Sequence, residues 1–390
     1  MDARTGLPVV GMVGAGQLAR MTHQAAIALG QSLRVLADTA DDGAALVAHD
    51  VEVGDYRSLE DLRRFAAGCD VVTWDHEHVP NEHIRALAAD GVVVHPGADA
   101  LRFAQDKAVM RARLTELGIP SPRWRRIEAA SELDEFAEQV GWPLVLKAAR
   151  GGYDGKGVWV VGNALDAAAL LAELLDAGTP LIAEQKVPIA RELAADVARS
   201  PYGQGAVWPV VETVQRDGIC VEVIAPAPDL SDERSDQAQQ LALRIASELG
   251  VTGVLAVELF ETTDGRLLVN ELAMRPHNSA HWTIEGARTS QFEQHLRAVL
   301  DYPLGATSLT APVVVMANLL AGPDGVVPKG IDERMHHCMA RWPDVKIHLY
   351  GKGFRPGRKV GHVTALGRDL ADVRARATAA ADYLANGDAS

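Results

Sequence analysis

The sequence has few cysteines, no long hydrophobic run and no basic excess, and each absence excludes a class of protein. Its three cysteines, Cys69, Cys220 and Cys338, lie far apart and form no CxxC pair, which argues against a disulfide framework or structural zinc and fits a reducing compartment. The most apolar stretch, from Ala311 to Leu320, is shorter than the roughly 20 residues of a membrane span. No signal peptide is evident at the start of the chain, so we expect a cytoplasmic protein with no membrane partner.

The charge balance argues against a nucleic-acid partner. The net charge is −14, which disfavours binding to nucleic acids or anionic membranes over the whole surface but leaves room for a local basic pocket. The sequence also lacks the pattern GxxxxGK[ST], which marks the Walker A phosphate-binding loop. The chain has 390 residues, of which 48% are hydrophobic, and this length favours a globular protein of two to four domains.

Residues 8–100 alternate short apolar runs with helical patterns, which is typical of a parallel sheet covered by helices. The expected strands are Val9–Val13, Leu33–Ala37, Asp70–Trp74 and Val92–His95, and the expected helix is Gln17–Leu29. Beyond residue 100 we expect helices at Gln105–Leu117, Ala164–Leu175 and Ser231–Leu249, strands at Pro143–Ala148, Gly157–Val161 and Leu181–Val187, two or three strands within 192–228, and a hairpin within 251–275. Short strands and many glycines follow residue 310.

A glycine-rich turn, Gly14-Ala15-Gly16-Gln17-Leu18-Ala19, follows the first expected strand and opens the first expected helix. It fits the dinucleotide pattern GxGxxG/A, and Asp38 lies at the end of the next strand, where an acid would bind a ribose. Small residues there let an anionic group approach the helix N-terminus. Three interpretations remain open: an NAD site, a phosphate or ribose site without nicotinamide, and a tight structural turn.

A lysine inside an apolar strand marks a second candidate site. Lys147 follows Leu144-Val145-Leu146, and burying a lysine there is costly without an anionic partner. Four glycines occupy the seven positions from 151 to 157, which favours a mobile flap whose N–H groups wrap phosphate oxygens. Lys156 adds a cation at the tip of this flap. A plain glycine hairpin is the alternative.

The register of a predicted hairpin brings two carboxylates together. Asp264-Gly265 is a strong two-residue turn signal, and with that turn residues pair when their numbers add up to 529. Glu258 then lies directly opposite Glu271, and two facing carboxylates repel each other. A divalent cation, Mg²⁺ or Mn²⁺, would relieve this repulsion, with Asn270 as a further ligand or a neighbour. Protonation of one glutamate, or outward exposure of both, is the alternative.

Three other segments are rich in polar groups. Glu184, on the strand Leu181–Val187, is placed either to accept hydrogen bonds from an adenine amino group or a ribose, or on a solvated strand face. The run Arg275–Trp282 is dense in donors and follows the hairpin at once, which suggests substrate contact. Residues 352–359 carry four cations in eight positions, which suits phosphate recognition, with a solvated basic turn as the alternative.

Taken together, these motifs resemble the ATP-grasp superfamily and, within it, the N5-carboxyaminoimidazole ribonucleotide synthase family. The resemblance covers about residues 9–367 and departs from the family pattern at a few positions, among them Ala15, Ala19, Gln215 and Ala280. It rests on Gly14–Met21 (GGGQLxRM), Glu77–Pro80 (ENVP), Gln105-Asp106-Lys107 (QDK), the flap Gly152–Gly157, Asn270–Ser279 (NExxPRxHNSGH) and Gly351–Lys359 (YGKxxxRxGRKxGH).

The resemblance implies a role for each matched residue. It implies ATP contacts at Lys107, Lys147, Gly152, Tyr153, Asp154, Gly155, Lys156, Gly157, Glu184, Val187, Glu192, Gln215, Asn270 and Glu271, and Mg²⁺ or Mn²⁺ at Glu258 and Glu271. It implies ribonucleotide contacts at Gln17, Leu18, Glu77, Tyr153, Asp154, Arg275, His277, Asn278, Ser279, Lys352, Arg355 and Arg358. The catalytic candidates are Lys147 and Arg275, which would neutralise phosphoryl charge, and Asp154, which would orient the substrate amine or bicarbonate.

The resemblance further implies a mixed α/β and α+β ATP-grasp fold and a homodimer. The expected domains are a Rossmann-like pre-ATP-grasp domain (1–102), an ATP-grasp subdomain with the flap (103–186), a second with the metal site (187–310) and a small β-rich domain (311–390). The implied activity is that of a ligase in purine (IMP) biosynthesis, which carboxylates 5-aminoimidazole ribonucleotide with ATP and bicarbonate through carboxyphosphate. The alternatives are a formate-dependent glycinamide ribonucleotide transformylase or another ATP-grasp ligase, an NAD-dependent Rossmann dehydrogenase, and a catalytically silent nucleotide-binding regulator.

Overall fold

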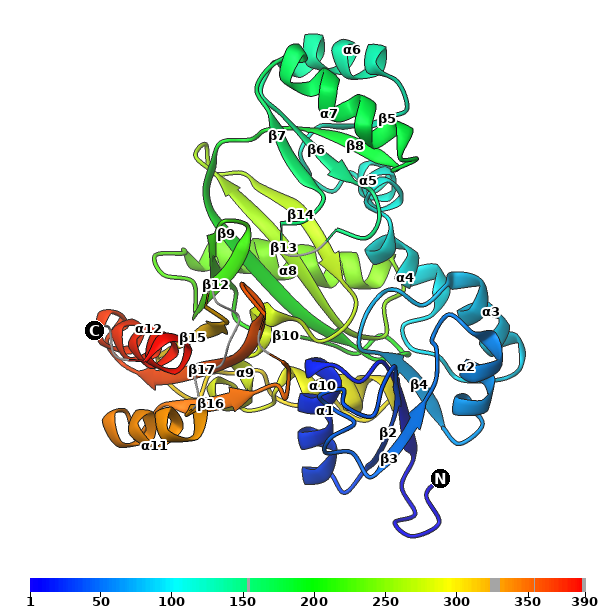
Figure 1. The fold of residues 1–390 in the computed structure, drawn as a ribbon, viewed down its shortest axis with the longest axis vertical. Helices are drawn as coiled ribbons and strands as arrows, with labels where there is room; N and C mark the ends of the chain where they lie inside the picture. Colours follow the sequence, from blue (N-terminus) through cyan, green and yellow to red (C-terminus); the bar gives the residue numbers. More distant parts are fainter. Residues whose placement is uncertain (153–154, 323–329, 354, 388–390) are drawn as a thin grey trace.

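The computed structural model describes residues 1–152, 155–322, 330–353 and 355–387. Tyr153 and Asp154, two of the predicted site residues, lie outside the described residues. Figure 1 shows the N-terminal sheet at the lower right, a separate lobe of residues 124–185 at the top, and the C-terminal strands and helices at the lower left. A long central sheet connects them.

The N-terminal sheet is parallel, as the alternating pattern predicted, and has the strand order β3-β2-β1-β4. Its strands are β1 (Val9–Val13), β2 (Ser32–Ala37), β3 (Asp50–Val53) and β4 (Val71–Trp74), and its helices are α1 (Gln17–Ala28), α2 (Leu59–Ala66) and α3 (Asn81–Ala89). The strand predicted at Val92–His95 is wrong, because only an isolated bridge joins Val94 to Val72 and the following Pro96 has no N–H to extend a ladder. The opposite edge of the sheet, next to β2, is formed by β3, a half-polar strand that the pattern did not reveal.

The helix predicted at Gln105–Leu117 is confirmed from Lys107 to Glu116, and a second helix, which was not predicted, precedes it on the way into the upper lobe. The boundary between the two helices is Asp106, whose carboxylate accepts hydrogen bonds from the N–H groups of Ala108 and Val109. The helices are α4 (Ala98–Gln105) and α5 (Lys107–Glu116). The lobe is an antiparallel sheet of order β5-β8-β6-β7, formed by β5 (Trp124–Ile127), β6 (Leu144–Ala148), β7 (Val158–Val161) and β8 (Leu181–Gln185), with α6 (Ala130–Val140) and α7 (Ala164–Asp176) packed on it.

Over the residues that the structure describes, the central sheet has nine strands and runs through both the middle and the C-terminal part of the chain. Its path is β14-β13-β9-β11-β12-β15-β17-β16, and β10 pairs with β9. The pairing of β12 with β15 joins residues 222–225 to residues 314–317 in one sheet. The strands are β9 (Ile189–Arg199), β10 (Gly205–Val207), β11 (Val211–Arg216), β12 (Ile219–Ala225), β13 (Gly253–Thr262), β14 (Leu267–Ala273), β15 (Val313–Leu320), β16 (Lys346–Leu349) and β17 (Lys359–Gly367). Four strands, β9 to β12, thus occupy the region where two or three were expected.

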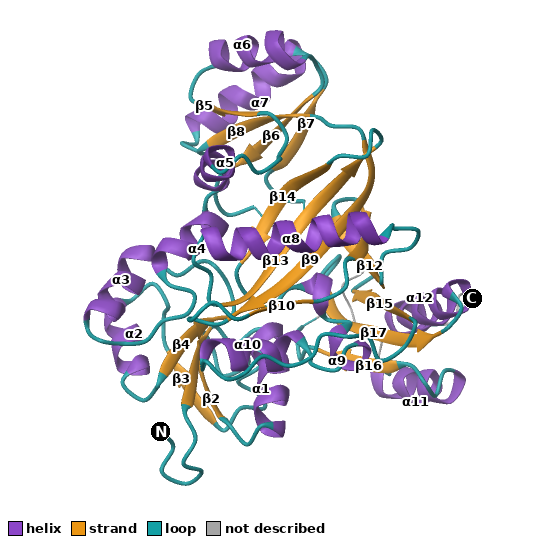
Figure 2. Ribbon diagram, turned by 180° about the vertical axis from the view of Figure 1, so that it is seen from behind, coloured by secondary structure: helices purple, strands orange, loops and turns teal. Residues whose placement is uncertain are grey.

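Helices cover this sheet and fix its position against the other parts. Figure 2 shows α8 (Asp232–Glu248) lying across the strands β9 and β13, which it contacts. A 3-10 turn η1 (Asn278–Ala280), α9 (Thr283–Gly286) and α10 (Gln291–Val299) follow the hairpin β13–β14, and α10 packs against α1 of the N-terminal sheet. The C-terminal helices are α11 (Ile331–Arg341) and α12 (Leu370–Asn386).

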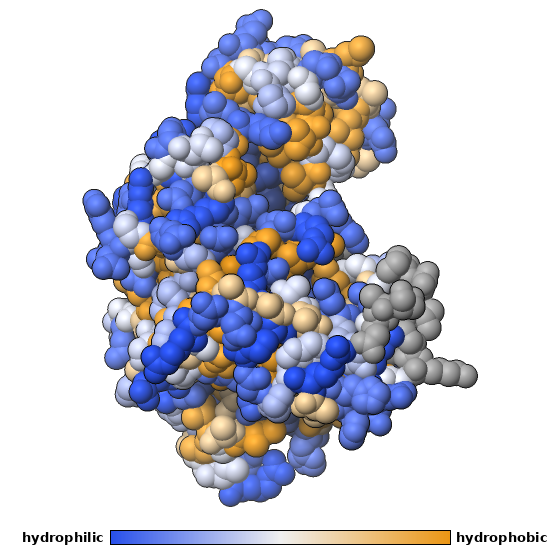
Figure 3. All heavy atoms as spheres, turned by 90° about the vertical axis from the view of Figure 1, so that its left-hand side faces the viewer, coloured by the Kyte–Doolittle hydropathy of each residue, from blue (hydrophilic) through white to orange (hydrophobic). Residues whose placement is uncertain are grey.

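The space-filling view in Figure 3 shows the upper lobe standing above the rest of the molecule, with a recess beneath it. Within the described residues, no helix combines the length and the apolar character that crossing a membrane requires.

Candidate active site

The hairpin β13–β14 pairs Glu258 with Glu271, as the sequence predicted, but by a different route. The turn is a three-residue loop, closed by a hydrogen bond of 2.9 Å from the Thr262 N–H to the Arg266 carbonyl, so the predicted two-residue turn is wrong. This loop shifts the pairing by one residue near the turn, where Phe260 faces Leu268. A β-bulge between Glu258 and Leu259 shifts it back, so the predicted glutamate pair is confirmed.

The carboxylate pair has the chemistry of a divalent-cation site. Burial and the charges of Glu271 and Glu192 together raise the pKa of Glu258 to about 7. Asn270, at the bulge, donates from Nδ2 to Glu258 Oε2 at 3.3 Å, and Lys107 Nζ lies 2.5 Å from Glu271 Oε1. The part of the chain that the structure describes contains no group of three or more metal-ligating side chains. A pair of carboxylates nevertheless fits Mg²⁺, which commonly takes one or two carboxylates plus phosphate oxygens.

Lys147 on β6 has the anionic partner that its burial requires. Its Nζ lies 2.8 Å from Glu184 Oε2 on β8 and donates to Asn270 Oδ1 at 3.0 Å. Arg111 on α5 donates from Nε to the other Glu184 oxygen and from Nη2 to the Asn270 carbonyl, both at 2.7 Å. Burial alone would raise the pKa of Glu184. The positive charges and hydrogen bonds of Lys147 and Arg111 outweigh the effect of burial and lower this pKa to about 2. This network ties the upper lobe to the carboxylate hairpin.

The described residues of the flap, 151–152 and 155–157, lie between β6 and β7 in the upper lobe. Its glycines adopt positive φ at Gly151, Gly155 and Gly157, and the Ala148 N–H donates to the Gly157 carbonyl at 2.8 Å. A Cβ at Gly155 would lie 3.3 Å from the Cα of Gly218 at the β11–β12 turn. Val187 is buried just after β8, Glu192 lies on β9, and Gln215 on β11 donates to Thr213 Oγ1 at 3.5 Å. Contact of these residues with ATP stays a prediction.

The glycine turn before α1 already holds an anion, and that anion is Asp75. One Asp75 oxygen accepts from the Gly16 N–H at 2.6 Å, and the other accepts from the Ala19 N–H at 3.0 Å. A Cβ at Gly14, whose φ is +97°, would lie 2.8 Å from the Asp75 Cβ, so this turn needs glycine. The amide groups that would bind a dinucleotide pyrophosphate are therefore taken by an internal carboxylate, which argues against the dehydrogenase interpretation.

The predicted ribonucleotide residues from three parts of the chain meet near this turn. Lys352 hydrogen-bonds Gln17 at the start of α1, and Arg275 donates to Glu77 Oε2 at 2.7 Å. Arg358 donates to the Gly353 carbonyl at 3.1 Å. Leu18, by contrast, packs in a small core cluster with Met21, Phe292 and Tyr350. Arg355 is exposed, and its backbone carbonyl accepts a hydrogen bond from the Arg358 N–H.

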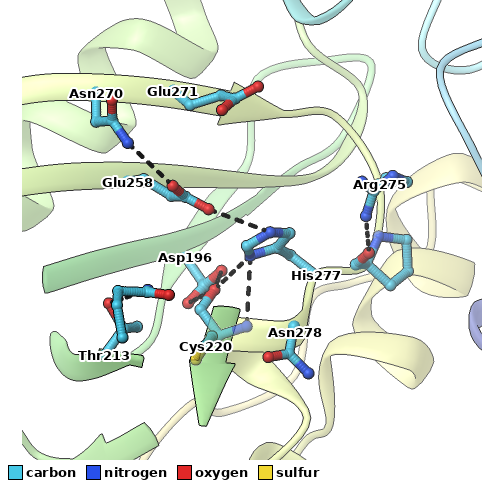
Figure 4. Close-up of polar contacts among 12 residues, drawn as sticks. Asp196, Thr213, Cys220, Glu258, Asn270, Glu271, Arg275, His277 and Asn278 are labelled. Atoms are coloured by element: carbon cyan, nitrogen blue, oxygen red, sulfur yellow. Dashed lines mark hydrogen bonds and ion pairs between the residues drawn. The ribbon is translucent and has the colours of Figure 1, made fainter. Parts of the chain in front are cut away.

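The segment after β14 carries the remaining predicted substrate residues. Figure 4 shows the His277 ring beside Glu258 and Asp196, with Arg275 to its right and Asn278 below it. His277 Nε2 lies 3.4 Å from Glu258 Oε1, and burial together with Arg275 and Lys359 lowers the pKa of His277 well below its usual value. Asn278 exchanges side-chain hydrogen bonds of 2.9 Å and 2.8 Å with Asn318, and Ser279 Oγ contacts Asp196.

Sequence reasoning missed three charged residues that organise the site: Arg111, Asp75 and Asp196. Arg111 lies between Met110 and Leu114 on the buried side of α5, and Asp196 lies in the apolar run from Leu193 to Ala198. The signal that singled out Lys147, a charge inside an apolar element, applies to both. Asp75 had no such signal, because its role depends on the position of a helix 59 residues earlier in the chain.

Three families match the chain in succession. The ribonucleotide synthetase preATP-grasp domain matches residues 7–105, the ATP-grasp domain matches residues 112–292, and the phosphoribosylaminoimidazole carboxylase C-terminal domain matches residues 314–376. The fold and the matched domains define an ATP-grasp ligase, as expected from the motifs.

Similarity to known proteins indicates which family of ATP-grasp ligases the chain belongs to. The chain is 60% identical, over 97% of its length and 88% of the relative's, to the N5-carboxyaminoimidazole ribonucleotide synthase of Mycobacterium tuberculosis. A Thermus thermophilus synthetase of that name has a crystal structure with a TM-score of 0.86 and 37% identity, covering 97% of this chain and 98% of that one. The Aspergillus clavatus synthase in complex with ADP and 5-aminoimidazole ribonucleotide has a TM-score of 0.86 and 33% identity, with 97% and 98% coverage. The chain belongs to the N5-carboxyaminoimidazole ribonucleotide synthase family.

Proposed function

We propose that this chain uses ATP and bicarbonate to carboxylate 5-aminoimidazole ribonucleotide, giving the N5-carboxy product, ADP and phosphate, in purine biosynthesis. One observation carries the proposal: two lysines suited to bind phosphate contact the strand that leads into the donor-rich segment Arg275–Ser279. Lys107 contacts Glu271 and Lys147 contacts Asn270, and both of these residues lie on β14. A family member crystallised with ADP and the ribonucleotide supports both ligands.

The reaction has two steps in this proposal. Bicarbonate attacks the γ-phosphorus of ATP, the bond to the β-phosphate oxygen breaks, and carboxyphosphate and ADP form. The exocyclic amine then attacks the carboxyl carbon, the carbon–oxygen bond to phosphate breaks, and the amine proton leaves with the phosphate. Neither step needs a covalent bond to the protein, so the task of the side chains is to position the reactants and to stabilise charge.

The described side chains divide this task between two ends of the site. Lys107 and Lys147 would neutralise the phosphates of ATP, and the Glu184 pair holds Lys147 in place. Arg275, held by Glu77, and His277 would face the carboxyphosphate end. Mg²⁺ held by Glu258 and Glu271 would supply charge neutralisation at the transferred phosphoryl group. Closure of the flap would exclude the water that hydrolyses the intermediate, and Asp154 is proposed to orient the amine or bicarbonate.

The test is ADP release from ATP, Mg²⁺ and bicarbonate, with and without 5-aminoimidazole ribonucleotide, together with transfer of labelled bicarbonate to the product. We expect the ribonucleotide to stimulate ADP release strongly in the native chain but not in Glu271→Ala. The matched control is Glu135→Ala, because that glutamate is exposed on α6 in the upper lobe, away from the hairpin.

Each alternative has its own outcome in this assay. Activity on formate with glycinamide ribonucleotide would favour the transformylase, and nucleotide binding without stimulated turnover would favour a silent regulator. A homodimer and a cytoplasmic location belong to the same proposal, and sedimentation analysis tests the first of them.

A further inference from the structure

Asn318 is an amide side chain inside an apolar strand of the C-terminal region. It lies on β15, where the residues from Val314 to Leu319 are all buried, and Asn318 itself is 6% exposed. Alternation along the strand puts Asn318 on the same face as Val314 and Met316, which belong to one apolar cluster. An amide buried in such surroundings is costly unless its donors and its acceptor are paired.

Asn318 has partners on two other elements. Its Nδ2 donates to the Cys220 carbonyl on β12 at 2.9 Å and to Asn278 Oδ1 on η1 at 2.8 Å. Its Oδ1 accepts from Asn278 Nδ2 at 2.9 Å. Asn278 is 9% exposed, so the two amides form a buried pair that is joined by two hydrogen bonds. Figure 4 shows Asn278 and Cys220 beside the candidate active site.

The Cys220 carbonyl fixes the orientation of this amide pair. A carbonyl oxygen only accepts hydrogen bonds, so the Asn318 atom that faces it must be the nitrogen and not the oxygen. Both Nδ2 protons of Asn318 are then used, and its Oδ1 faces the Asn278 nitrogen. The donors and acceptors are amides and a backbone carbonyl, so the assignment does not depend on pH.

A second buried amide holds the neighbouring residue of the same segment. Gln291, at the start of α10, accepts from the His277 N–H at 2.7 Å and donates to the His277 carbonyl at 2.8 Å. The backbone of His277 is therefore held by α10, and the side chain of Asn278 is held by β15. Together they fix the donor-rich segment Arg275–Ser279 against two elements that come later in the chain.

The C-terminal sheet also contacts a second segment with predicted ribonucleotide residues. In the ladder of β15 and β17, Asn318 pairs with His362. His362 Nδ1 lies 2.8 Å from the Tyr350 hydroxyl oxygen, and Lys352, two residues further on, hydrogen-bonds Gln17. Strands of the C-terminal part of the chain thus support both groups of residues that are predicted to bind the ribonucleotide.

We propose that Asn318 is a positioning residue for the ribonucleotide: its amide holds Asn278, and with it the segment Arg275–Ser279, in the arrangement that binds this substrate. Asn278 is then the anchor of the segment. Binding groups keep their affinity only while the residues behind them hold them in place. The inference rests on the proposed function, because it takes the ribonucleotide as the ligand of this segment.

The binding test is calorimetric titration of the full chain with 5-aminoimidazole ribonucleotide in the presence of ADP and Mg²⁺, and separately with ADP and Mg²⁺ alone. Asn318→Leu should raise the Kd for the ribonucleotide about 10-fold, because the segment loses its anchor, and should leave the Kd for ADP within about 2-fold of the native value. An unchanged Kd for the ribonucleotide, or an equal rise in both Kd values, would overturn the proposal.

Two further variants separate positioning from a general loss of stability. Asn163→Ala removes an amide that caps α7 in the upper lobe, where Asn163 Oδ1 accepts from the Asp166 N–H at 3.0 Å. This control should destabilise the chain and leave the Kd for the ribonucleotide unchanged, and a rise like that of Asn318→Leu would count against positioning. Asn318→Ser, with a smaller polar side chain, replaces Asn318→Leu if the latter does not fold, with the same expected rise.

A double-mutant cycle by urea unfolding tests the amide pair without any ligand. Asn278→Leu and Asn318→Leu should each lower the folding equilibrium constant about 30-fold, because each leaves a buried amide without its partner. The loss in the double variant should be smaller than the product of the two losses by about 10-fold or more, and independent losses would refute the pairing.

The outcomes also separate this inference from the proposed function. A native chain that binds the ribonucleotide but does not carboxylate it would refute the proposed function, and the Kd values would still decide the role of Asn318. A native chain that does not bind the ribonucleotide would refute both.

Discussion

Glu258 and Glu271 face each other across two antiparallel strands because a β-bulge compensates for the length of the turn. Like charges placed directly opposite each other destabilise a hairpin, so this pair is a local conflict within an otherwise apolar sheet. The conflict is a natural one for a cation site, since a divalent ion converts the repulsion into two ligands.

Replacement of Glu258 by glutamine tests the cation interpretation of this pair. We expect the Mg²⁺-dependent rate of ADP release to fall by about 100-fold, because the amide cannot replace a charged ligand. The free energy of unfolding without metal should not fall, because the change removes a like-charge contact. Steady-state kinetics and urea unfolding measure the two quantities. Full activity in Glu258→Gln would exclude a metal role for this residue.

The buried pair of Arg111 and Glu184 should matter far more than a surface pair on the same helix. Their side chains are 1% and 3% exposed, whereas those of Arg113 and Glu116 are 34% and 65% exposed. Arg111→Leu should lower the free energy of unfolding by about 3 kcal/mol, because it leaves Glu184 with one cation in a buried site. Arg113→Leu, the matched control, should change it by less than about 1 kcal/mol. Urea denaturation of both variants gives the comparison, and similar losses would contradict the argument.

Asp75 should act as the cap of α1 although it follows β4, 59 residues after Gly16 in the chain. Asp75→Ala removes the acceptor of two N–H groups and should cost about 1–2 kcal/mol of unfolding free energy. The control is Asp99→Ala, because Asp99 is exposed in the first turn of α4 and pairs with Arg85 at the surface. Thermal unfolding of the two variants is the measurement. A gain in NAD binding in Asp75→Ala would revive the dinucleotide interpretation of this turn.

The raised pKa of Asp196 predicts a pH-dependent stability with a definite sign. The folded state favours the protonated form, so the stabilisation is complete below the usual pKa of 3.8 and is lost as pH rises through about 7. Relative to the native chain, Asp196→Asn should therefore gain about 2 kcal/mol between pH 5.5 and pH 8.5. Urea unfolding at both pH values measures this gain, and the exposed Asp134→Asn should show none. A difference that does not change with pH would mean that Asp196 is already ionised at the lower pH.

Local sequence patterns determine many of the helices and strands of this protein and indicate its family. The parallel N-terminal sheet, the strand that carries Lys147 and the helix 232–248 follow from apolar periodicity and from glycine positions, which act over a few residues. The motifs around Gly14, the flap and Asn270–Ser279 indicated the family that the comparisons then confirmed.

Only the tertiary structure decided which distant groups meet. It showed that Asp75 fills the anion site of α1, that Arg111 and Lys147 share Glu184, and that Asp196 reaches His277 through Ser279. It also showed that a three-residue loop and a bulge together produce the predicted glutamate pair. Sequence periodicity reports which face of an element is buried, but a hydrogen bond between residues far apart in the chain depends on how whole elements pack, and no local pattern encodes that distance.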